Sequence, residues 1–419
     1  AAVQFRRGNV AWKIEEGFAD LVSGSASPDW FALDHWKGAT RAKVGHRREV
    51  WRVAVAGGEF FAKVHHFPEG GIADVVRGAW GLTAAHREWR ATREALRRGA
   101  PVIHVIALGS RGGRRAGAVL ISVSAEGAES LADAWLSTPS DVSPRNAARV
   151  RRGLLEATAQ LFAAAHARGV VHEDGHPSNI LVERRQTEAP VARFADLGRR
   201  SITKGRASLA RVVESLAQLD QYFHREASAR QRVQFLKRYL GQFGYPAEAV
   251  GCERAFRRSL ALRIEAARRQ HALRLARRRD RRIGRNGVYF ATIISGPGLR
   301  ATVALKLSRR RILPEPQVPD HTIKDWDECL QSVAYAFRTG EPITLPGSHE
   351  RFRVVTERSS GVVVKLAWML FGAPQRREFA RLHRQRHRDL AGPLPLAYVE
   401  HRCWWGGIDA TCLILHAGG

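Results

Sequence analysis

The sequence predicts an α+β fold of two lobes, a small β-rich lobe with one key helix followed by a helical lobe. In the first lobe, residues 50–64 carry alternating apolar runs around Gly57 and Gly58, which predicts a β-hairpin. Later in the chain, residues 144–168, 209–223 and 231–239 have the apolar spacing of helices. At 419 residues, 44% of them hydrophobic, the chain is long enough for two or three domains with real cores.

The small lobe is expected to hold a lysine and a glutamate opposite each other. Lys63 lies on the second strand of the predicted hairpin, where it can reach nucleotide phosphates. Residues 84–99 have helical spacing and end at Gly99, which predicts a helix that carries Glu88. We expect Lys63 and Glu88 to form an ion pair, with Glu94 as the alternative partner.

The two lobes are expected to join after an apolar strand. Residues 118–124 are mostly apolar and lead to Glu126 and Gly127. An adenine ring would stack near this connection. Glu126 is therefore a candidate nucleotide-binding residue.

The most informative segment follows the 144–168 helix. It reads His172-Glu-Asp174-Gly-His-Pro-Ser-Asn179, then an apolar strand, and one hairpin later Phe-Ala-Asp196-Leu-Gly198. In phosphoryl transfer the protein mainly aligns the attacking hydroxyl and neutralises phosphate charge. Asp174 would accept the proton of that hydroxyl, and Asn179 and Asp196 offer the oxygen atoms that magnesium prefers. We expect His172 to brace the loop backbone, and the pattern as a whole predicts a kinase.

Several further motifs resemble those of the lipopolysaccharide core kinases, which phosphorylate heptose or Kdo sugars. The resemblance covers about residues 30–285. Its motifs are Trp36-Lys-Gly, Arg47-Arg48-x-x-Trp-Arg-Val, Phe61-Ala-Lys63-Val-His65, the long insert of residues 68–82, Arg87-Glu88-Trp89 and the loop around Asp174.

The resemblance implies a protein-kinase-like fold, ATP and Mg²⁺, and a sugar or glycolipid acceptor. It implies that Lys63 binds phosphate, Glu88 braces Lys63, Asp174 is the catalytic base, and Asn179 and Asp196 bind the metal. His176-Pro177 fits small-molecule and sugar kinases better than protein kinases.

Three features depart from the family pattern. Residues 37–46 contain only Gly38 and Gly45 where a glycine-rich phosphate loop is expected, position 173 is a glutamate, and the metal-binding triplet reads Asp-Leu-Gly. Two alternatives follow: a protein Ser/Thr or Tyr kinase with the same machinery, and a catalytically weak pseudokinase that acts as a nucleotide sensor or scaffold.

The charge of the chain favours anionic partners. Lys and Arg number 68 against 40 Asp and Glu, a formal net charge of +28. A phosphorylated glycolipid or an anionic membrane surface would suit this field, and the densest basic run is residues 268–282. We expect nucleic acid to be an unlikely partner.

The cysteines and the apolar runs bear on the compartment. The four cysteines have no CxxC spacing, and no apolar run reaches the length of a membrane span. We therefore expect a cytoplasmic protein that can contact the inner membrane peripherally. The oligomeric state is not predicted.

The last third of the chain repeats the first lobe. Residues 351–356, 361–366, 376–379 and 411–416 match, in order, the first strand of the hairpin, the lysine strand, the Arg-Glu-aromatic helix and the strand before the lobe connection. Lys365 and Glu378 would then form a second ion pair. We expect a catalytic domain at residues 1–285, with lobes of about 1–125 and 126–285. Residues 286–419 would be a partial second N-lobe, truncated or non-catalytic, since no second catalytic loop follows.

Overall fold

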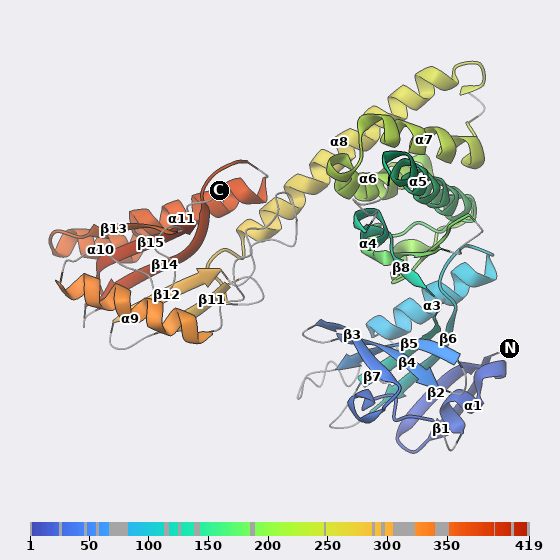
Figure 1. Cartoon of the computed structure of the whole chain (residues 1–419), viewed down its shortest axis with the longest axis horizontal. Coiled ribbons are helices and arrows are strands. Elements are labelled where there is room, and N and C mark those ends of the chain that lie inside the picture. The colour runs from blue at the N-terminus through green and yellow to red at the C-terminus, as the bar shows by residue number, and fades with distance from the viewer. Residues whose placement is uncertain are drawn as a thin grey trace. The chain divides into compact units, whose positions relative to one another are not determined.

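The chain divides into two compact units, Ala1–Arg268 and Arg269–Gly419. Each unit contains its own β-sheet in this computed structural model (Figure 1). The structure describes residues 2–24, 27–45, 48–55, 58–66, 83–112, 117–124, 127–137, 143–184, 189–246, 249–286, 290–294, 298–304, 323–339, 352–388, 390–403 and 406–416.

The first unit starts with a seven-stranded antiparallel sheet of order β1-β2-β6-β7-β5-β4-β3. The predicted hairpin is β4 and β5, with Val50 opposite Lys63. The strands are β1 (Ala2–Arg7), β2 (Val10–Glu15), β3 (Ala39–Gly45), β4 (Arg48–Val55), β5 (Gly58–His66), β6 (Val105–Arg111) and β7 (Gly117–Val123). Short helical turns lie at η1 (Glu16–Phe18), α1 (Asp20–Ser23) and η2 (Leu33–His35).

The two faces of this sheet are covered differently. Successive strand residues point to opposite faces, so Trp51 and Val53 of β4 enter a core with Trp12 of β2. Lys63 and Leu120 are cross-strand partners on the other face, which packs against α3 (Ala84–Arg97). There Leu120 and Trp89 share a buried cluster, and burial of each such side chain contributes roughly 1.5–3 kcal/mol. This packing holds α3 over β6 and β7, and β7 is the neighbour of the lysine strand β5.

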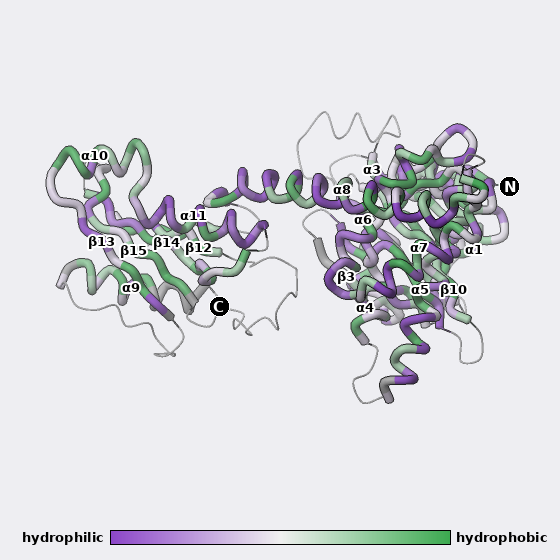
Figure 2. The backbone as a smooth tube through the Cα atoms, turned by 90° about the horizontal axis from the view of Figure 1, so that it is seen from above, coloured by the Kyte–Doolittle hydropathy of each residue, from purple (hydrophilic) through white to green (hydrophobic). Residues whose placement is uncertain are grey.

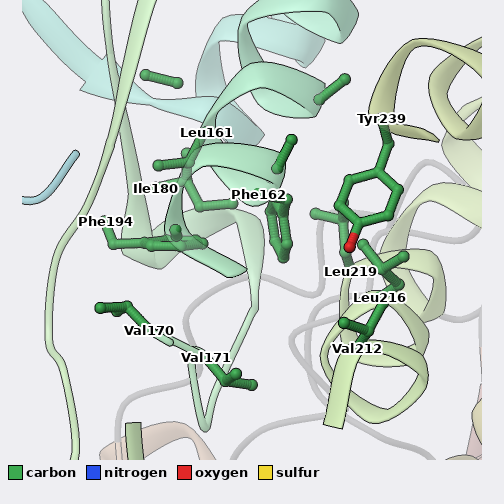
Figure 3. Close-up of a cluster of buried hydrophobic side chains, with 14 of the residues drawn as sticks. Leu161, Phe162, Val170, Val171, Ile180, Phe194, Val212, Leu216, Leu219 and Tyr239 are labelled. Atoms are coloured by element: carbon green, nitrogen blue, oxygen red, sulfur yellow. The ribbon is translucent and has the colours of Figure 1, made fainter. Parts of the chain in front are cut away.

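The second lobe of the first unit is mostly helical. Its helices are α4 (Leu131–Leu136), α5 (Pro144–Ala167), α6 (Leu209–Glu226), α7 (Ala229–Phe243) and α8 (Glu253–Asp280), and α8 continues across the boundary into the second unit. Phe162 of α5 lies at the centre of the core, between Phe194 on one side and Tyr239 on the other (Figure 3). The rings of Phe162 and Phe194 meet edge to face at 5.0 Å.

A small three-stranded sheet carries the segment that follows α5. Its order is β10-β9-β8, with strands β8 (Ala128–Ser130), β9 (Ile180–Glu183) and β10 (Val191–Phe194). The predicted hairpin is present, with Ile180 opposite Phe194. Both of these residues are fully buried against α5, so the hairpin is held rigidly. The turns η3 (Pro177–Asn179) and η4 (Arg199–Ser201) flank it.

The second unit contains a five-stranded antiparallel sheet of order β11-β12-β14-β15-β13. Leu330 and Val333 of α9 pack on one face, and Phe379 and Leu382 of α11 belong to a separate cluster with Leu413 and Leu415. The elements are β11 (Phe290–Ile294), β12 (Leu299–Ala304), α9 (Ile323–Thr339), β13 (Phe352–Arg358), α10 (Val362–Phe371), α11 (Pro374–His387), β14 (Leu394–Arg402) and β15 (Ile408–His416).

The neighbours of β15 match those of β7. β15 lies between β14 and β13, and α11 falls between β13 and β14 in the sequence, as β7 lies between β6 and β5 with α3 between them in the sequence. By this order β13 corresponds to β5, the lysine strand. That the second unit is a partial N-lobe stays a prediction.

The predicted strand at residues 361–366 is wrong. These residues begin the helix α10, which is largely apolar in Figure 2. Gly361, with φ +92°, ends the extended backbone between β13 and α10. The place beside β15 is taken by β13, so a strand at 361–366 would have no partner there. A short apolar run does not distinguish a strand from a helix by its pattern alone.

The second predicted ion pair is also wrong. The Lys365 Nζ atom lies 3.6 Å from the Cys403 sulfur, and Glu378 pairs with Arg381 at 2.5 Å. Helix α10 carries Lys365 out of the sheet, which removes it from the place that corresponds to Lys63.

Candidate active site

The predicted lysine–glutamate pair is present and buried. The Lys63 Nζ atom lies 2.5 Å from Glu88 Oε1, and Glu88 is only 5% exposed. Helix α3 starts at Thr83, whose hydroxyl accepts a hydrogen bond from the His86 amide and so defines where the helix begins. Burial raises the pKa of Glu88, and the charge of Lys63 opposes part of that rise. The pair is therefore a desolvated one, sensitive to loss of either partner.

The alternative partner, Glu94, is excluded by its own contacts. Its carboxylate pairs with Arg97 at 2.8 Å and with Arg98 at 2.7 Å on the exposed side of α3. Glu94 lies six residues after Glu88, and such a spacing places the two side chains on different faces of a helix.

Asp196 connects the two lobes of the first unit through a second set of ion pairs. It follows β10, and its Oδ1 lies 3.4 Å from Lys63 Nζ, while its Oδ2 lies 3.0 Å from Arg48 Nη1. Burial by itself would raise the pKa of Asp196, but the charges of Lys63 and Arg48 outweigh it and lower the pKa to about 2. The carboxylate therefore stays ionised at neutral pH.

The backbone at Asp196 has an uncommon conformation. Its φ of +61° is the only positive value at a non-glycine residue in the described part of the chain. A non-glycine residue in the left-handed backbone region is conformationally strained, and such residues cluster at functional sites. Gly198 follows closely, and a Cβ atom there would collide with the Glu173 carboxylate.

His172 holds the loop that carries Asp174. Its Nε2 donates to the Ala195 carbonyl at 2.6 Å, and its Nδ1 accepts from the Asp174 amide at 3.0 Å. Burial lowers the pKa of His172, which keeps the ring neutral and consistent with one donating and one accepting nitrogen. These contacts match the bracing role expected for His172.

Asn179 lies against Asp174. Its side-chain amide donates to the Asp174 carbonyl at 3.0 Å and to Asp174 Oδ2 at 3.3 Å. The Gln218 side chain of α6 accepts the Gly175 amide at 2.7 Å, a contact that the sequence did not indicate. The loop between α5 and β9 is thus held from three directions.

The β9–β10 hairpin brings Asn179 and Asp196 to the same end of the small sheet. Asn179 precedes β9, Asp196 lies two residues after β10, and the Ala195 amide donates to the Asn179 carbonyl at 2.8 Å. The oxygens of an ionised carboxylate and a carboxamide suit a hard cation such as Mg²⁺. Within the described ranges, no group of three or more His, Cys, Asp and Glu side chains could hold a metal. That Asn179 and Asp196 bind the metal stays a prediction.

Two other predicted features can be located. His176 packs its ring edge to face on Tyr222 of α6 at 5.7 Å, and Pro177 is buried in η3. Glu126 lies outside the described residues, as do the whole expected insert at 68–82 and the tip of the β3–β4 hairpin.

The contact between Arg48 and Asp196 was not among the predicted ones. A signal was available, because Arg48 and Lys63 lie on neighbouring strands of one hairpin. With Val50 opposite Lys63, Arg48 falls on the same face of the sheet, opposite His65.

Comparison with protein families identifies the catalytic part of the chain. Residues 63–239 match the model described as "Lipopolysaccharide kinase (Kdo/WaaP) family", a range that begins at Lys63 and includes the whole 172–198 segment. This segment is therefore similar to the lipopolysaccharide kinase family. The chain is accordingly a kinase, a phosphotransferase with a hydroxyl acceptor, and it has the bilobal kinase-like fold.

Solved structures with a related fold are distant from this kinase. WaaP, solved in complex with acyl carrier protein, is 21% identical, with a TM-score of 0.42 over 61% of this chain and 98% of that one. The BubR1 kinase domain is 11% identical, with a TM-score of 0.33 over 64% and 87% of the two chains. The kinase domain of maize SIRK1, bound to AMP-PNP, is 14% identical, with a TM-score of 0.26 over 43% and 68%. No curated protein matches the chain.

Proposed function

We propose that this kinase transfers the γ-phosphoryl group of ATP to a hydroxyl of a sugar or glycolipid of the lipopolysaccharide-core type. One observation carries the proposal: the Lys63–Glu88 pair of the first lobe meets Asp196 of the second, next to the loop that presents Asp174. An ammonium group, a carboxylate that is ionised at neutral pH and a candidate base around one site suit phosphoryl transfer.

Asp174 is the proposed base. The Asn179 amide contacts one of its carboxylate oxygens, and the His172 ring accepts a hydrogen bond from its backbone amide, so both the carboxylate and the loop are held in place. A base held in this way would accept the hydroxyl proton as the oxygen attacks phosphorus.

Lys63 is the proposed phosphate-binding residue, and Glu88 the residue that positions it. The buried Glu88 carboxylate directs the ammonium group toward the interlobe side, where it also contacts Asp196. Asn179 and Asp196 would hold Mg²⁺, which when bound would neutralise charge on the nucleotide phosphates. Glu126 is kept as a nucleotide-binding candidate from the sequence.

The acceptor class is inferred from the family and from the charge. A formal net charge of +28 favours an anionic acceptor such as a phosphorylated glycolipid. His176 contacts α6 rather than presenting a basic group beside the base, consistent with a sugar acceptor.

Phosphate transfer to lipopolysaccharide core oligosaccharide, measured beside generic protein acceptors, tests this proposal. Asp174→Asn is expected to lower the rate on the order of 10²- to 10⁴-fold. Asp34→Asn removes an exposed carboxylate in the first lobe and serves as the matched control. Equal rates for wild type and Asp174→Asn would refute the role of Asp174. Transfer to protein alone would favour the protein kinase alternative, and nucleotide binding without any transfer would favour the pseudokinase.

We also infer that the kinase works at the cytoplasmic face of the inner membrane, in peripheral contact with it. The arginine-rich half of α8 exposes Arg274, Arg277 and Arg278, and each suitably placed basic residue contributes about 1 kcal/mol on an anionic surface. No helix in the described ranges is long and apolar enough to span a bilayer. Sedimentation with anionic vesicles that is lost at high salt supports this contact, and equal binding to neutral vesicles contradicts it.

A further inference from the structure

Two cations share the Asp196 carboxylate, one on each oxygen. Lys63 reaches Oδ1 and Arg48 reaches Oδ2. With Glu88, the four charged side chains sum to zero formal charge. Lys63 pairs with both acids, and Arg48 supplies the second positive charge that brings this sum to zero.

The two cations differ in how firmly they are held. The side chain of Lys63 is 15% exposed and contacts two carboxylates, whereas that of Arg48 is 35% exposed and contacts Asp196 alone among the ion pairs of the described residues. Arg48 is the first residue of β4, where the β3–β4 hairpin closes. Its guanidinium can therefore leave Asp196 without disturbing the Lys63–Glu88 pair.

The β3–β4 hairpin lies where kinases usually bind phosphates with backbone amides, and here it is poor in glycine. Between residues 37 and 46 only Gly38 and Gly45 occur. Gly38 has a structural role at the edge of the sheet. Its carbonyl accepts a hydrogen bond from the Ala54 amide at 2.8 Å, and a Cβ atom at residue 38 would lie 2.5 Å from the Ala54 carbonyl oxygen. The usual backbone cradle for phosphates is thus reduced to at most one glycine.

We propose that Arg48 is a second phosphate-binding residue of the nucleotide site, replacing part of the glycine-rich loop. This inference rests on the proposed function. In the free protein Arg48 pairs with Asp196. A cation bound at Asp196 would compete with Arg48 for Oδ2, and the freed guanidinium would then bind the nucleotide phosphates. Arg suits this role because its planar fork donates to two phosphate oxygens at once.

Binding of ADP and of adenosine, each measured by calorimetry in the presence of Mg²⁺, tests the proposal without relying on activity. Arg48→Ala is expected to weaken ADP binding about 10- to 100-fold, the value of a charge-assisted hydrogen bond, and to leave adenosine binding unchanged. Arg48→Lys keeps the charge but not the fork, so a smaller loss of ADP affinity is expected. Arg52→Ala is the control, because Arg52 lies on the same strand and pairs with Glu59.

The outcomes separate this inference from the proposed function. If Arg48→Ala binds ADP as tightly as wild type or more tightly, the inference is overturned, and the only role left for Arg48 is its ion pair with Asp196. If Arg48→Ala does not fold, the ratio of ADP to adenosine affinity in Arg48→Lys decides: a ratio equal to that of wild type overturns the inference. Failure of wild type to bind ADP at all would instead refute the proposed function.

Discussion

Loss of either partner of the Lys63–Glu88 pair should destabilise the first unit, but not equally. At an effective dielectric constant of about 20, unit charges 2.5 Å apart attract by roughly 7 kcal/mol, of which desolvation offsets a large part. Lys63→Met leaves Glu88 buried and unpaired beside the Asp196 carboxylate, so a cost of about 3–5 kcal/mol is expected. Glu88→Gln leaves Lys63 with Asp196 at 3.4 Å, so a cost of about 1–2 kcal/mol is expected.

The penalty of Lys63→Met should also depend on pH. Burial raises the pKa of Glu88, and in Lys63→Met this pKa rises further because the opposing charge is gone. The contribution of Glu88 to the stability of the variant is therefore greatest at low pH, where Glu88 is protonated, and it is lost as the pH rises through the pKa of Glu88 in the folded state. Asp196 loses one of the two charges that lower its pKa to about 2, so it contributes less stability above its unfolded value of 3.8. Both effects make the penalty larger near pH 7 than near pH 4.

Urea titration at both pH values measures the free energy of unfolding of the two variants. Hydrogen exchange of the amides in α3 and β5 assigns the transition to the first unit, since the chain has two compact units. Glu378→Gln breaks an ion pair in the second unit and is the control. A Glu88→Gln penalty equal to that of Lys63→Met, or a Lys63→Met penalty independent of pH, would refute the reasoning.

Two further predictions concern the helical lobe. Gly169→Ala should cost well over 2 kcal/mol in urea titration, because φ is +68° and the new Cβ atom would lie 1.9 Å from the Gly205 carbonyl oxygen. The control Gly127→Ala has the same φ but open space around the new Cβ atom, so it should cost only about 1–2 kcal/mol. Similar costs for the two variants would contradict the packing argument. His166 is fully buried and bonded to Tyr239, and burial lowers its pKa to about 3 from 6.5. Stability should therefore fall as the pH is lowered from 6.5 toward 3, and His166→Gln should flatten this decline by up to about 1.4 kcal/mol per pH unit; an unchanged slope in thermal or urea unfolding would count against it.

Local sequence patterns were sufficient to predict most elements of the first unit that carry the candidate site. The Gly57-Gly58 turn signal and the flanking alternation predict β4 and β5, and the spacing and Gly99 predict α3. The segment from His172 to Asp196 was recognisable because phosphoryl transfer requires particular side chains at particular offsets.

Residues 361–366 do not form the strand that their local pattern predicts. A short apolar run fits a strand and a helix equally well. Here β13 takes the place beside β15, so residues 361–366 have no strand to pair with. The second ion pair was inferred from that strand, so it failed for the same reason.

The sequence by itself determined which residues can do the chemistry and on which local elements they lie, because hairpins, helices and catalytic loops follow from neighbouring residues. Only the tertiary structure decided how distant residues meet. It directs Glu88 rather than Glu94 at Lys63, and it sets Arg48 against Asp196, 148 residues later. Such contacts depend on how a sheet face, a helix and a hairpin pack together, and local patterns can only propose candidate partners for them.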